Sequence, residues 1–313
     1  MKVKFSFSGM TYKNQQKFIT ILFLLVPLLL LIVFTYLPLG SMIGYSFTKW
    51  NGYSPTKEFV GLDNYVTVFS RPEYFGLFKT SLYYLVGSFV QIGLALLFAT
   101  LLSFELKAKN FFKGSLFFPY LINGVAVGFI FLYFFKPMGT LDSILAVMDL
   151  DDNVMKLIGE VNRQGELVSP KWIGNPKLVN VSLAFASVWR YMGMNIVMFV
   201  GAIQSISSEL YEASSLDGAN RWQQFKFIIF PIIKPVINLN LLLAVKGALT
   251  VFEMPYIMTG GGNGSATFVT QTMDTAFKYQ KVGLASAMAI VLLVIILVIA
   301  FIQDIAFKEK KEA

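Results

Sequence analysis

Six long apolar segments constrain this chain more than any other feature of its sequence. They lie at about residues 18–47, 80–104, 116–135, 178–203, 232–257 and 283–307. Each is long enough, or nearly so, for the roughly 20 residues that a helix needs to cross a bilayer. Charged residues make up 14% of the 313 residues, against about 25% in an average soluble domain. The sequence therefore predicts an all-α integral membrane protein with six transmembrane helices.

The distribution of Lys and Arg predicts how these helices are oriented. With the N-terminus inside, the inner segments hold 13 Lys or Arg in 65 residues, and the outer segments hold 11 in 100. Because positive residues concentrate on the cytoplasmic side, we expect both termini there, at 1–17 and 308–313, flanking a transmembrane domain at 18–307. The net charge of +8 follows this topology and does not indicate nucleic acid. The loop at 136–177 has no clear period and is expected to form a small irregular lobe outside the cell.

A polar stretch at 207–231 separates the fourth and fifth apolar segments. Ser207 or Ser208 can cap a short helix by accepting a hydrogen bond from a free N–H of its first turn. Gly218 can adopt the left-handed conformation that ends such a helix. A second short helix is expected from about residue 220 to 230. The stretch thus predicts two short helices with a bend between them, on the cytoplasmic side.

The charges of this stretch agree with the predicted helix boundaries. Glu209 and Glu212 place negative charge in the first turns, where the helix dipole favours it. Pro231 suits the first turn of the helix that follows. Local physics leaves two interpretations open: a solvated loop between two spans, or a rigid element that docks onto another protein.

Several chemistries are excluded by residue content. The chain has no Cys and no His, so it can form no disulfide, thiol nucleophile, Cys or His metal site or histidine proton relay. The phosphate-binding pattern G-x-x-x-x-G-K-[ST] is absent from the sequence. We therefore expect no cofactor in this chain, and any ATP and Mg²⁺ that drive it to be bound by partner subunits.

Three charged residues, Arg190, Lys246 and Glu253, fall inside predicted spans. Each costs about 2.5–3.5 kcal/mol at a helix centre, so each is expected to face protein or water. Lys246 and Glu253 are seven residues apart and would share a helix face. Two interpretations remain open: a structural ion pair between Arg190 and Glu253, or a polar path for a solute. The candidate residues for that path are Trp189, Arg190, Asn195, Lys246, Glu253 and Tyr256.

The polar stretch resembles the signature of the membrane subunits of binding-protein-dependent ABC importers. That signature is Glu-Ala-Ala, three residues, Gly, nine residues, then Ile-x-Leu-Pro. Here it stands as Glu212-Ala213-Ser214, Gly218 and Ile228-Ile229-Phe230-Pro231. The spacing matches throughout, with Ser214 and Phe230 departing from the pattern.

Other stretches are similar to the carbohydrate-uptake branch, in the manner of the first permease of maltose and glycerol-phosphate systems. They are Phe59-Val-Gly-Leu-Asp-Asn-Tyr65, Phe111-Phe-Lys-Gly-Ser-Leu-Phe-Phe-Pro119, Glu209-Leu-Tyr-Glu-Ala-Ser-Ser-Leu-Asp-Gly-Ala219, and Phe252-Glu before Met258-Thr-Gly-Gly-Gly262. The resemblance covers about residues 18–307.

The resemblance implies a type I importer permease, without enzymatic activity of its own, that moves a sugar or oligosaccharide across the plasma membrane by alternating access. It further implies a second homologous permease, two ATPase subunits and an extracellular solute-binding protein as partners. The polar stretch would couple the permease to the ATPase through Glu209, Glu212, Ala213, Ser214, Asp217, Gly218 and Pro231.

The main alternative is an ion-coupled secondary sugar transporter that works without an ATPase. It would need a proton or sodium relay inside the spans, where Glu253 is the one carboxylate, and no inverted repeat is evident in the sequence. For an intramembrane enzyme, the sequence offers no candidate constellation.

Overall fold

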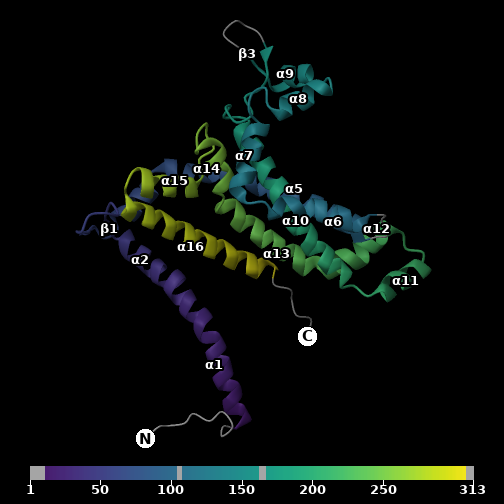
Figure 1. Cartoon of the computed structure of the whole chain (residues 1–313), viewed down its shortest axis with the longest axis horizontal. Helices are drawn as coiled ribbons and strands as arrows, with labels where there is room; N and C mark the ends of the chain where they lie inside the picture. The colour runs from purple at the N-terminus through teal and green to yellow at the C-terminus, as the bar shows by residue number, and fades with distance from the viewer. Residues whose placement is uncertain (1–10, 104–107, 162–166, 308–313) are drawn as a thin grey trace. The chain divides into compact units, whose positions relative to one another are not determined.

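A computed structural model describes residues 11–103, 108–161 and 167–307 of the chain (Figure 1). The expected N-terminal tail up to residue 10 and the tail at 308–313 lie outside the described residues. The chain divides into two compact units: Met1–Val68 with Thr275–Val291, and Phe69–Asp274 with Leu292–Ala313.

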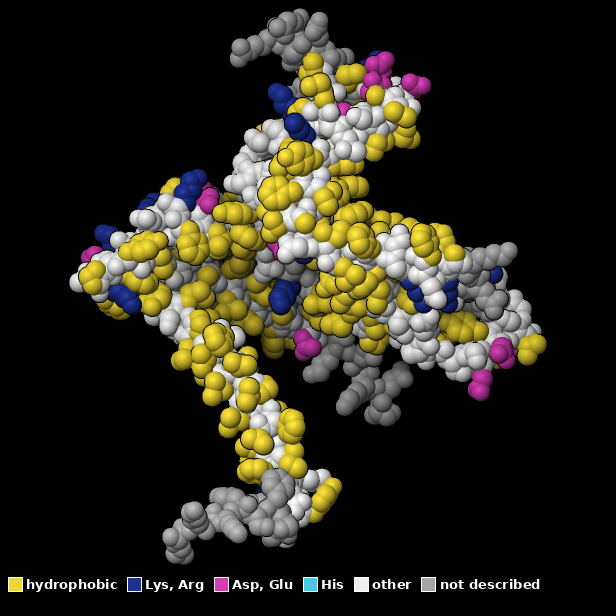
Figure 2. All heavy atoms as spheres, viewed as in Figure 1, with side chains coloured by type: hydrophobic (Ala, Val, Ile, Leu, Met, Phe, Trp, Pro, Cys, Tyr) yellow, Lys and Arg dark blue, Asp and Glu magenta, His cyan; other side chains and the backbone are white. Residues whose placement is uncertain are grey.

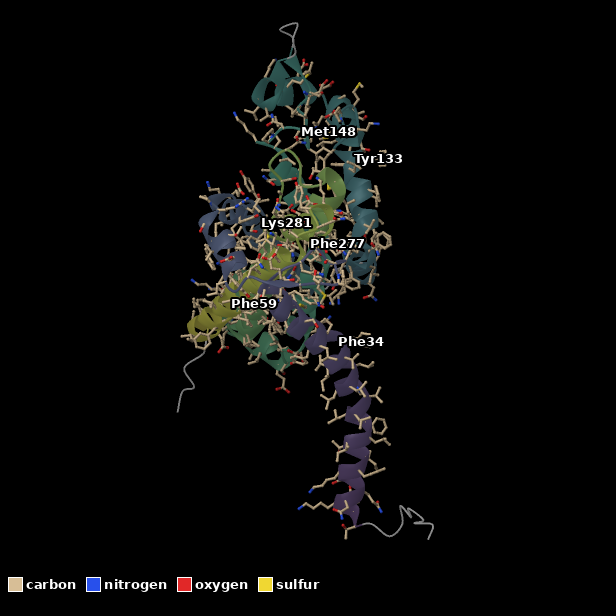
Figure 3. All side chains as sticks on the ribbon, turned by 90° about the vertical axis from the view of Figure 1, so that its left-hand side faces the viewer. Phe34, Phe59, Tyr133, Met148, Phe277 and Lys281 are labelled. Carbon is tan, nitrogen blue, oxygen red and sulfur yellow. The ribbon has the colours of Figure 1, made fainter. Side chains whose placement is uncertain are left out.

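A single long apolar helix dominates the first unit. It consists of α1 (Tyr12–Leu31), a π-helical turn η2 (Ile32–Tyr36) and α2 (Leu37–Ser46), 35 residues in all. The widened turn lies just before Pro38, which has no N–H to donate to the preceding turn. Hydrophobic side chains cover this helix (Figure 2), and Phe34, 74% exposed, projects from it (Figure 3). Such a surface is suited to lipid or to another membrane subunit.

The rest of the first unit forms a cap at the end of this helix. Strands β1 (Thr48–Lys49) and β2 (Glu58–Phe59) pair antiparallel, with Thr48 opposite Phe59, and α3 (Asp63–Ser70) follows. The π-helical turn η4 (Asp274–Lys278) precedes α16 (Val282–Phe307), the last candidate span, of which the residues up to Val291 belong to the first unit and the rest to the second. Gly283 at the start of α16 donates its N–H to the Trp50 carbonyl at 3.2 Å, and a side chain there would collide with the β1 backbone.

The second unit is built around α5 and α10, which pack along each other. α6 lies against α10, and α13 lies against α5 and α10. A small residue permits the close approach: a Cβ at Gly87 of α5 would lie 3.2 Å from the Val188 side chain of α10. The helices of this unit are α4 (Pro72–Gly76), α5 (Phe78–Ser103), α6 (Lys109–Leu121), α7 (Gly124–Phe134), α8 (Thr140–Val147), α9 (Asp151–Ile158), α10 (Val179–Gln204), α11 (Ser208–Leu216), α12 (Arg221–Gln224), the π-helical η3 (Phe225–Ile229), α13 (Phe230–Leu249), α14 (Glu253–Thr259) and α15 (Phe268–Met273).

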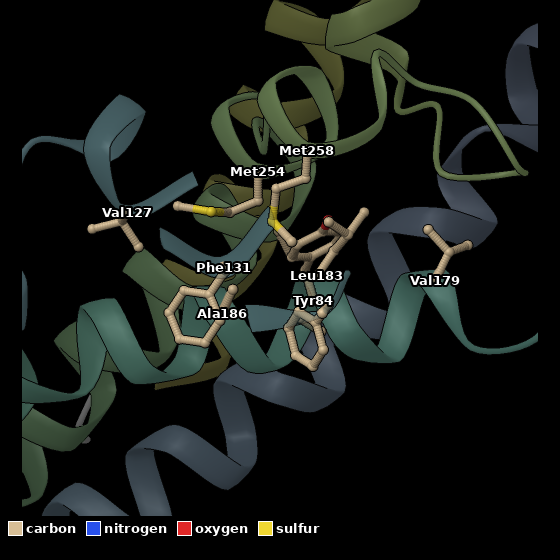
Figure 4. Close-up of a cluster of buried hydrophobic side chains, with 11 residues drawn as sticks. Tyr84, Val127, Phe131, Val179, Leu183, Ala186, Met254 and Met258 are labelled. Atoms are coloured by element: carbon tan, nitrogen blue, oxygen red, sulfur yellow. The ribbon is translucent and has the colours of Figure 1, made fainter. Parts of the chain in front are cut away.

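Two buried apolar clusters hold these helices together. The first gathers side chains of α5, α7, α10 and α14, including Tyr84, Phe131, Leu183 and Met254 (Figure 4). The second lies further along α5 and α10, where Ala99, Ile196 and Phe199 meet Ile229 and Ile233 of η3 and α13. Since α10 contributes to both clusters, it is the central element of this unit.

The third predicted span differs from expectation. Instead of one straight helix at 116–135, α6 and α7 meet at a bend of 97°. Ile122 is extended, and the Asn123 side chain accepts a hydrogen bond from the Val125 N–H at 2.8 Å, which starts α7 as a new helix. The described residues therefore contain five helices long and apolar enough to cross a membrane, or six if the bent pair is one span.

The fifth predicted span is also interrupted. α13 ends at Leu249, residues 250–252 are not helical, and α14 begins at Glu253. The expectation that Lys246 and Glu253 share one helix face was therefore wrong, because the helical period does not continue between them.

The expected irregular lobe at 136–177 has more structure than its sequence indicated. It contains α8, α9 and an antiparallel pair of short strands, β3 (Glu160–Val161) and β4 (Leu167–Val168). Its glycines and prolines lie mostly in the connections, and Trp172 donates a hydrogen bond to the Asp142 carboxylate at 2.8 Å.

Candidate functional site

The first candidate site is the polar loop between α10 and α13. Helix α11 begins as the sequence predicted, because the Ser207 hydroxyl accepts a hydrogen bond from the Glu209 N–H at 3.2 Å. Glu209 and Glu212 are exposed, and Glu209 lies in the first turn. Leu216 at the other end of α11 is 90% exposed. The helix thus presents both carboxylates and a large apolar side chain to its surroundings.

The end of α11 confirms the conformation predicted for Gly218. Its φ is +80°, and its N–H donates to the Ser215 carbonyl at 3.1 Å. The Ala219 N–H donates to the Ser214 carbonyl at 2.9 Å. These two bonds form a Schellman motif, in which a left-handed glycine satisfies the last carbonyls of the helix. Gly218 therefore fixes where the chain turns away from α11.

A glutamine that the sequence analysis missed holds the turn together. The Gln224 side chain is buried and donates at 3.0 Å to the hydroxyls of Ser214 and Ser215. Ser214, which departs from the family signature, is thus half-buried in an internal network, and its hydroxyl also donates to the Tyr211 carbonyl at 2.8 Å. Burial raises the pKa of Tyr211, which keeps its phenol neutral. Ser214 consequently stiffens the loop from within.

The second helix of the loop differs from the prediction. Asn220 and Gln223 form a capping box that starts α12, as a helix beginning near residue 220 requires. The helix does not end before Pro231, however, and runs through η3 directly into α13. Pro231 lies exposed just after the π-helical turn η3, whose wider spacing accommodates a residue without an N–H. The backbone is therefore continuously helical from Arg221 to Leu249.

The second candidate site is a cavity of about 510 Å³ among α5, α10, α13 and α14, to which α6 adds Tyr120. Aromatic, amide and hydroxyl groups line it together with apolar side chains. The lining residues with polar side chains are Tyr84, Ser88, Gln91, Tyr120, Ser187, Tyr191, Asn195, Asn240, Thr250 and Glu253. Such a mixture of rings and hydrogen-bonding groups suits an uncharged polar solute.

Three amides form a chain of hydrogen bonds along one side of this cavity. The Gln91 side chain of α5 donates to Asn195 Oδ1 of α10. Asn195 in turn donates to Asn240 Oδ1 of α13. Asn240 donates to the Val236 carbonyl at 2.8 Å. All three amides are buried, so the chain ties three helices together in an apolar environment.

An ion pair lies near the other end of the cavity. The Arg190 guanidinium of α10 donates to the Glu253 carboxylate of α14, and to the Tyr191 hydroxyl at 3.0 Å. The Arg190 side chain is 12% exposed and that of Glu253 is 42% exposed. Gly124, the first residue of α7, makes room for the pair, because a Cβ there would overlap both charged groups. The Arg190–Glu253 ion pair, one of the two interpretations that the sequence left open, is present in the structure, and it joins α10, α14 and the bend before α7.

Of the other residues predicted for the solute path, some line the cavity and some do not. Asn195 and Glu253 line the cavity. Trp189 instead packs on Phe131 in the first apolar cluster, with ring centroids 5.3 Å apart. Lys246 is exposed and does not line the cavity, and Tyr256 stacks on Phe252. Gln91 also lines the cavity and was not predicted, although it is a lone amide inside an apolar segment.

The arrangement of helices around the cavity occurs in known transport proteins. A crystal structure of a bacterial ABC transporter involved in the import of the acidic polysaccharide alginate contains a chain with TM-score 0.78 and 20% identity to this one. That comparison covers 96% of this chain and 98% of the other. The chain therefore has the fold of a type I importer permease.

The family is shown by the sequence. The model of the binding-protein-dependent transport system inner membrane component matches residues 91–311, and this chain belongs to that family. It is 34% identical to the probable ABC transporter permease YurN of Bacillus subtilis, over 96% of this chain and 99% of the relative. It is also 30% identical to the trehalose/maltose transport system permease MalF of Thermococcus litoralis, over 88% of each.

Proposed function

We propose that this chain is one of two permease subunits of an ATP-driven importer of sugars or oligosaccharides. An extracellular solute-binding protein would deliver the solute, and two ATPase subunits would bind ATP and Mg²⁺. The names of relatives support a carbohydrate: besides the trehalose/maltose permease, they include a multiple sugar-binding transport system permease of Streptococcus mutans, 30% identical. The excess of Lys and Arg on the inner segments supports cytoplasmic termini at the plasma membrane.

The observation that carries this proposal is the rigid, exposed loop at 207–231. Glu212, Ala213, Asp217 and Gly218 are exposed, while capping bonds fix the backbone beneath them. A surface that is both exposed and rigid suits docking, because little conformational entropy is lost when a partner binds. We assign the contact with the ATPase to Glu209, Glu212, Ala213, Asp217 and Gly218, with half-buried Ser214 supporting it from within and exposed Pro231 at the start of α13.

Force applied to this loop would reach the cavity through α13. The continuous helix from α12 through η3 to α13 carries Asn240, which is bonded to Asn195 of α10. We propose that closure of the ATPase dimer moves this helix and alternately opens the cavity to either side of the membrane. Asn195 and Glu253 would line the solute path, with Arg190 holding Glu253 in place.

The coupling role is tested at Gly218. Gly218→Pro cannot adopt the φ of +80° and would displace the second half of the loop, whereas Gly218→Asn tolerates the left-handed conformation. We expect Gly218→Pro to abolish ATP-driven uptake and Gly218→Asn to keep most of it, with equal amounts of both variants in the membrane. The measurement is uptake of radiolabelled maltose, trehalose, arabinotriose and diacetylchitobiose by proteoliposomes that contain the whole complex and its binding protein.

Two results would contradict the proposal. Wild-type uptake in Gly218→Pro, or in the charge reversal Glu212→Lys, would remove the docking role from this loop. Uptake of a sugar by the chain alone, without an ATPase and insensitive to ATP, would instead indicate an ion-coupled transporter.

A further inference from the structure

The amide chain along the cavity has a fixed direction. Its last acceptor is the Val236 carbonyl, and a backbone carbonyl can only accept hydrogen bonds. Asn240 must therefore turn its NH₂ group toward Val236 and its oxygen toward Asn195. Asn195 must then donate to Asn240 and accept from Gln91. One backbone carbonyl thus sets the orientation of all three amides.

This direction leaves one hydrogen-bond acceptor on Gln91, the first amide of the series. Gln91 donates to Asn195 through its NH₂ group, so its Oε1 is the atom that remains available to accept a hydrogen bond. Within the part of the chain that the structure describes, no protein group donates to this oxygen, and Gln91 lines the cavity while only 8% exposed. Hydrogen bonds in a chain polarise one another, which makes the oxygen of the first donor a stronger acceptor.

We propose that Gln91 Oε1 accepts a hydrogen bond from a hydroxyl group of an uncharged solute and thereby contributes to specificity. This inference rests on the proposed function and concerns the chemistry of the same cavity. The oxygen lies at the cavity wall, where water or a hydroxyl group of the solute can donate to it, so it favours a solute that brings a hydroxyl to that position over an apolar one.

The charges around the cavity agree with an uncharged solute. Glu253 is the charged side chain among the described lining residues, and its cation partner Arg190 is already engaged. An acidic sugar would place its own carboxylate near the Glu253 carboxylate and the Gln91 amide oxygen. The described cavity lining holds no free cation to balance that charge. The subunit therefore favours neutral sugars over uronic acids or sugar phosphates.

The test compares Gln91→Met with the wild type in the complete reconstituted transporter. Methionine keeps the length of the side chain and removes both polar atoms. The probe is whichever of maltose, trehalose, arabinotriose and diacetylchitobiose the wild type transports, together with its singly deoxygenated analogues and sn-glycerol 3-phosphate. We expect KM for the parent sugar to rise about three- to tenfold in Gln91→Met, as for the loss of one neutral hydrogen bond.

The deoxy analogues separate a direct contact from a structural effect. The analogue that lacks the hydroxyl in contact with Gln91 should have the same KM in the wild type and in Gln91→Met. Every other analogue should show the same rise in KM in Gln91→Met as the parent sugar. Thr100→Val is the matched control, because Thr100 lies on the same helix, makes one side-chain bond to the Leu96 carbonyl at 2.8 Å and is outside the cavity lining. If the transporter with Gln91→Met does not assemble, Gln91→Asn replaces it, because asparagine shortens the side chain and keeps the amide. The KM difference from the wild type should then again be absent for one analogue and present for the others.

The outcomes are distinguishable. An equal ratio of KM values for every analogue, or an unchanged KM for the parent sugar, would overturn the role of Gln91 and leave the proposed function intact. Preferred uptake of sn-glycerol 3-phosphate over the neutral sugars would overturn the inference on solute charge. Absence of ATP-driven uptake of all probes by the wild type would overturn the proposed function and this inference with it.

Discussion

The ion pair between Arg190 and Glu253 should be energetically asymmetric. Removing Glu253 leaves a guanidinium that is 12% exposed without its counter-charge, and breaking a buried pair in this way costs about 3–5 kcal/mol. Removing Arg190 leaves a carboxylate that is 42% exposed and borders the cavity, where water can reach it, so we expect a cost of about 1 kcal/mol. We therefore expect Glu253→Met to destabilise the protein by about 2 kcal/mol or more beyond Arg190→Met.

The double variant Arg190→Met/Glu253→Met tests whether the cost of Glu253→Met comes from the unpaired guanidinium. Replacing both partners with methionine removes both charges, so it should be more stable than Glu253→Met alone although it carries one more substitution. The assay is unfolding of the full-length chain in mixed micelles by titration with SDS, followed by tryptophan fluorescence. Glu73→Met is the control, since its pair with Arg71 is exposed on both sides and should contribute less than about 1 kcal/mol. Equal costs for the two single variants, or a double variant less stable than Glu253→Met, would refute the reasoning.

Two further predictions concern packing and the loop. Gly193→Ala should destabilise the chain by about 1–3 kcal/mol, because the added Cβ would lie 2.8 Å from the Phe117 Cα. Gly201→Ala is the control and should be neutral, because the space around Gly201 is open. SDS titration measures the stability of both variants, and a similar cost for the two would contradict the close contact. Gln224→Ala should loosen α11 by about 1–2 kcal/mol through loss of its bonds to two serine hydroxyls. Hydrogen exchange of α11 amides should then accelerate severalfold, and unchanged exchange would show that Gln224 does not hold the loop.

Local sequence signals were reliable where one residue's chemistry decides the structure. Ser207 as a cap and Gly218 as a left-handed helix end were both predicted, because each depends on neighbours within a few residues. The bend at Asn123 was not predicted, because the search for apolar runs passed over the Asn123-Gly124 pair, a turn signal inside the otherwise apolar residues 116–135. The same limit hid the interruption before Glu253, which a helical count from Lys246 passed over.

The sequence by itself determined the class of protein, the apolar segments and the capped polar loop that we propose as the coupling element, since hydropathy and capping are properties of short stretches. Only the tertiary structure decided which polar residues meet. Gln91, Asn195 and Asn240 come from three helices and are 104 and 45 residues apart along the chain. Burial forces such amides to find partners, but the identity of those partners depends on how helices are rotated against one another, which no local pattern records. For the same reason Trp189, promising in sequence, became part of the core, and a lone glutamine became a candidate for solute recognition.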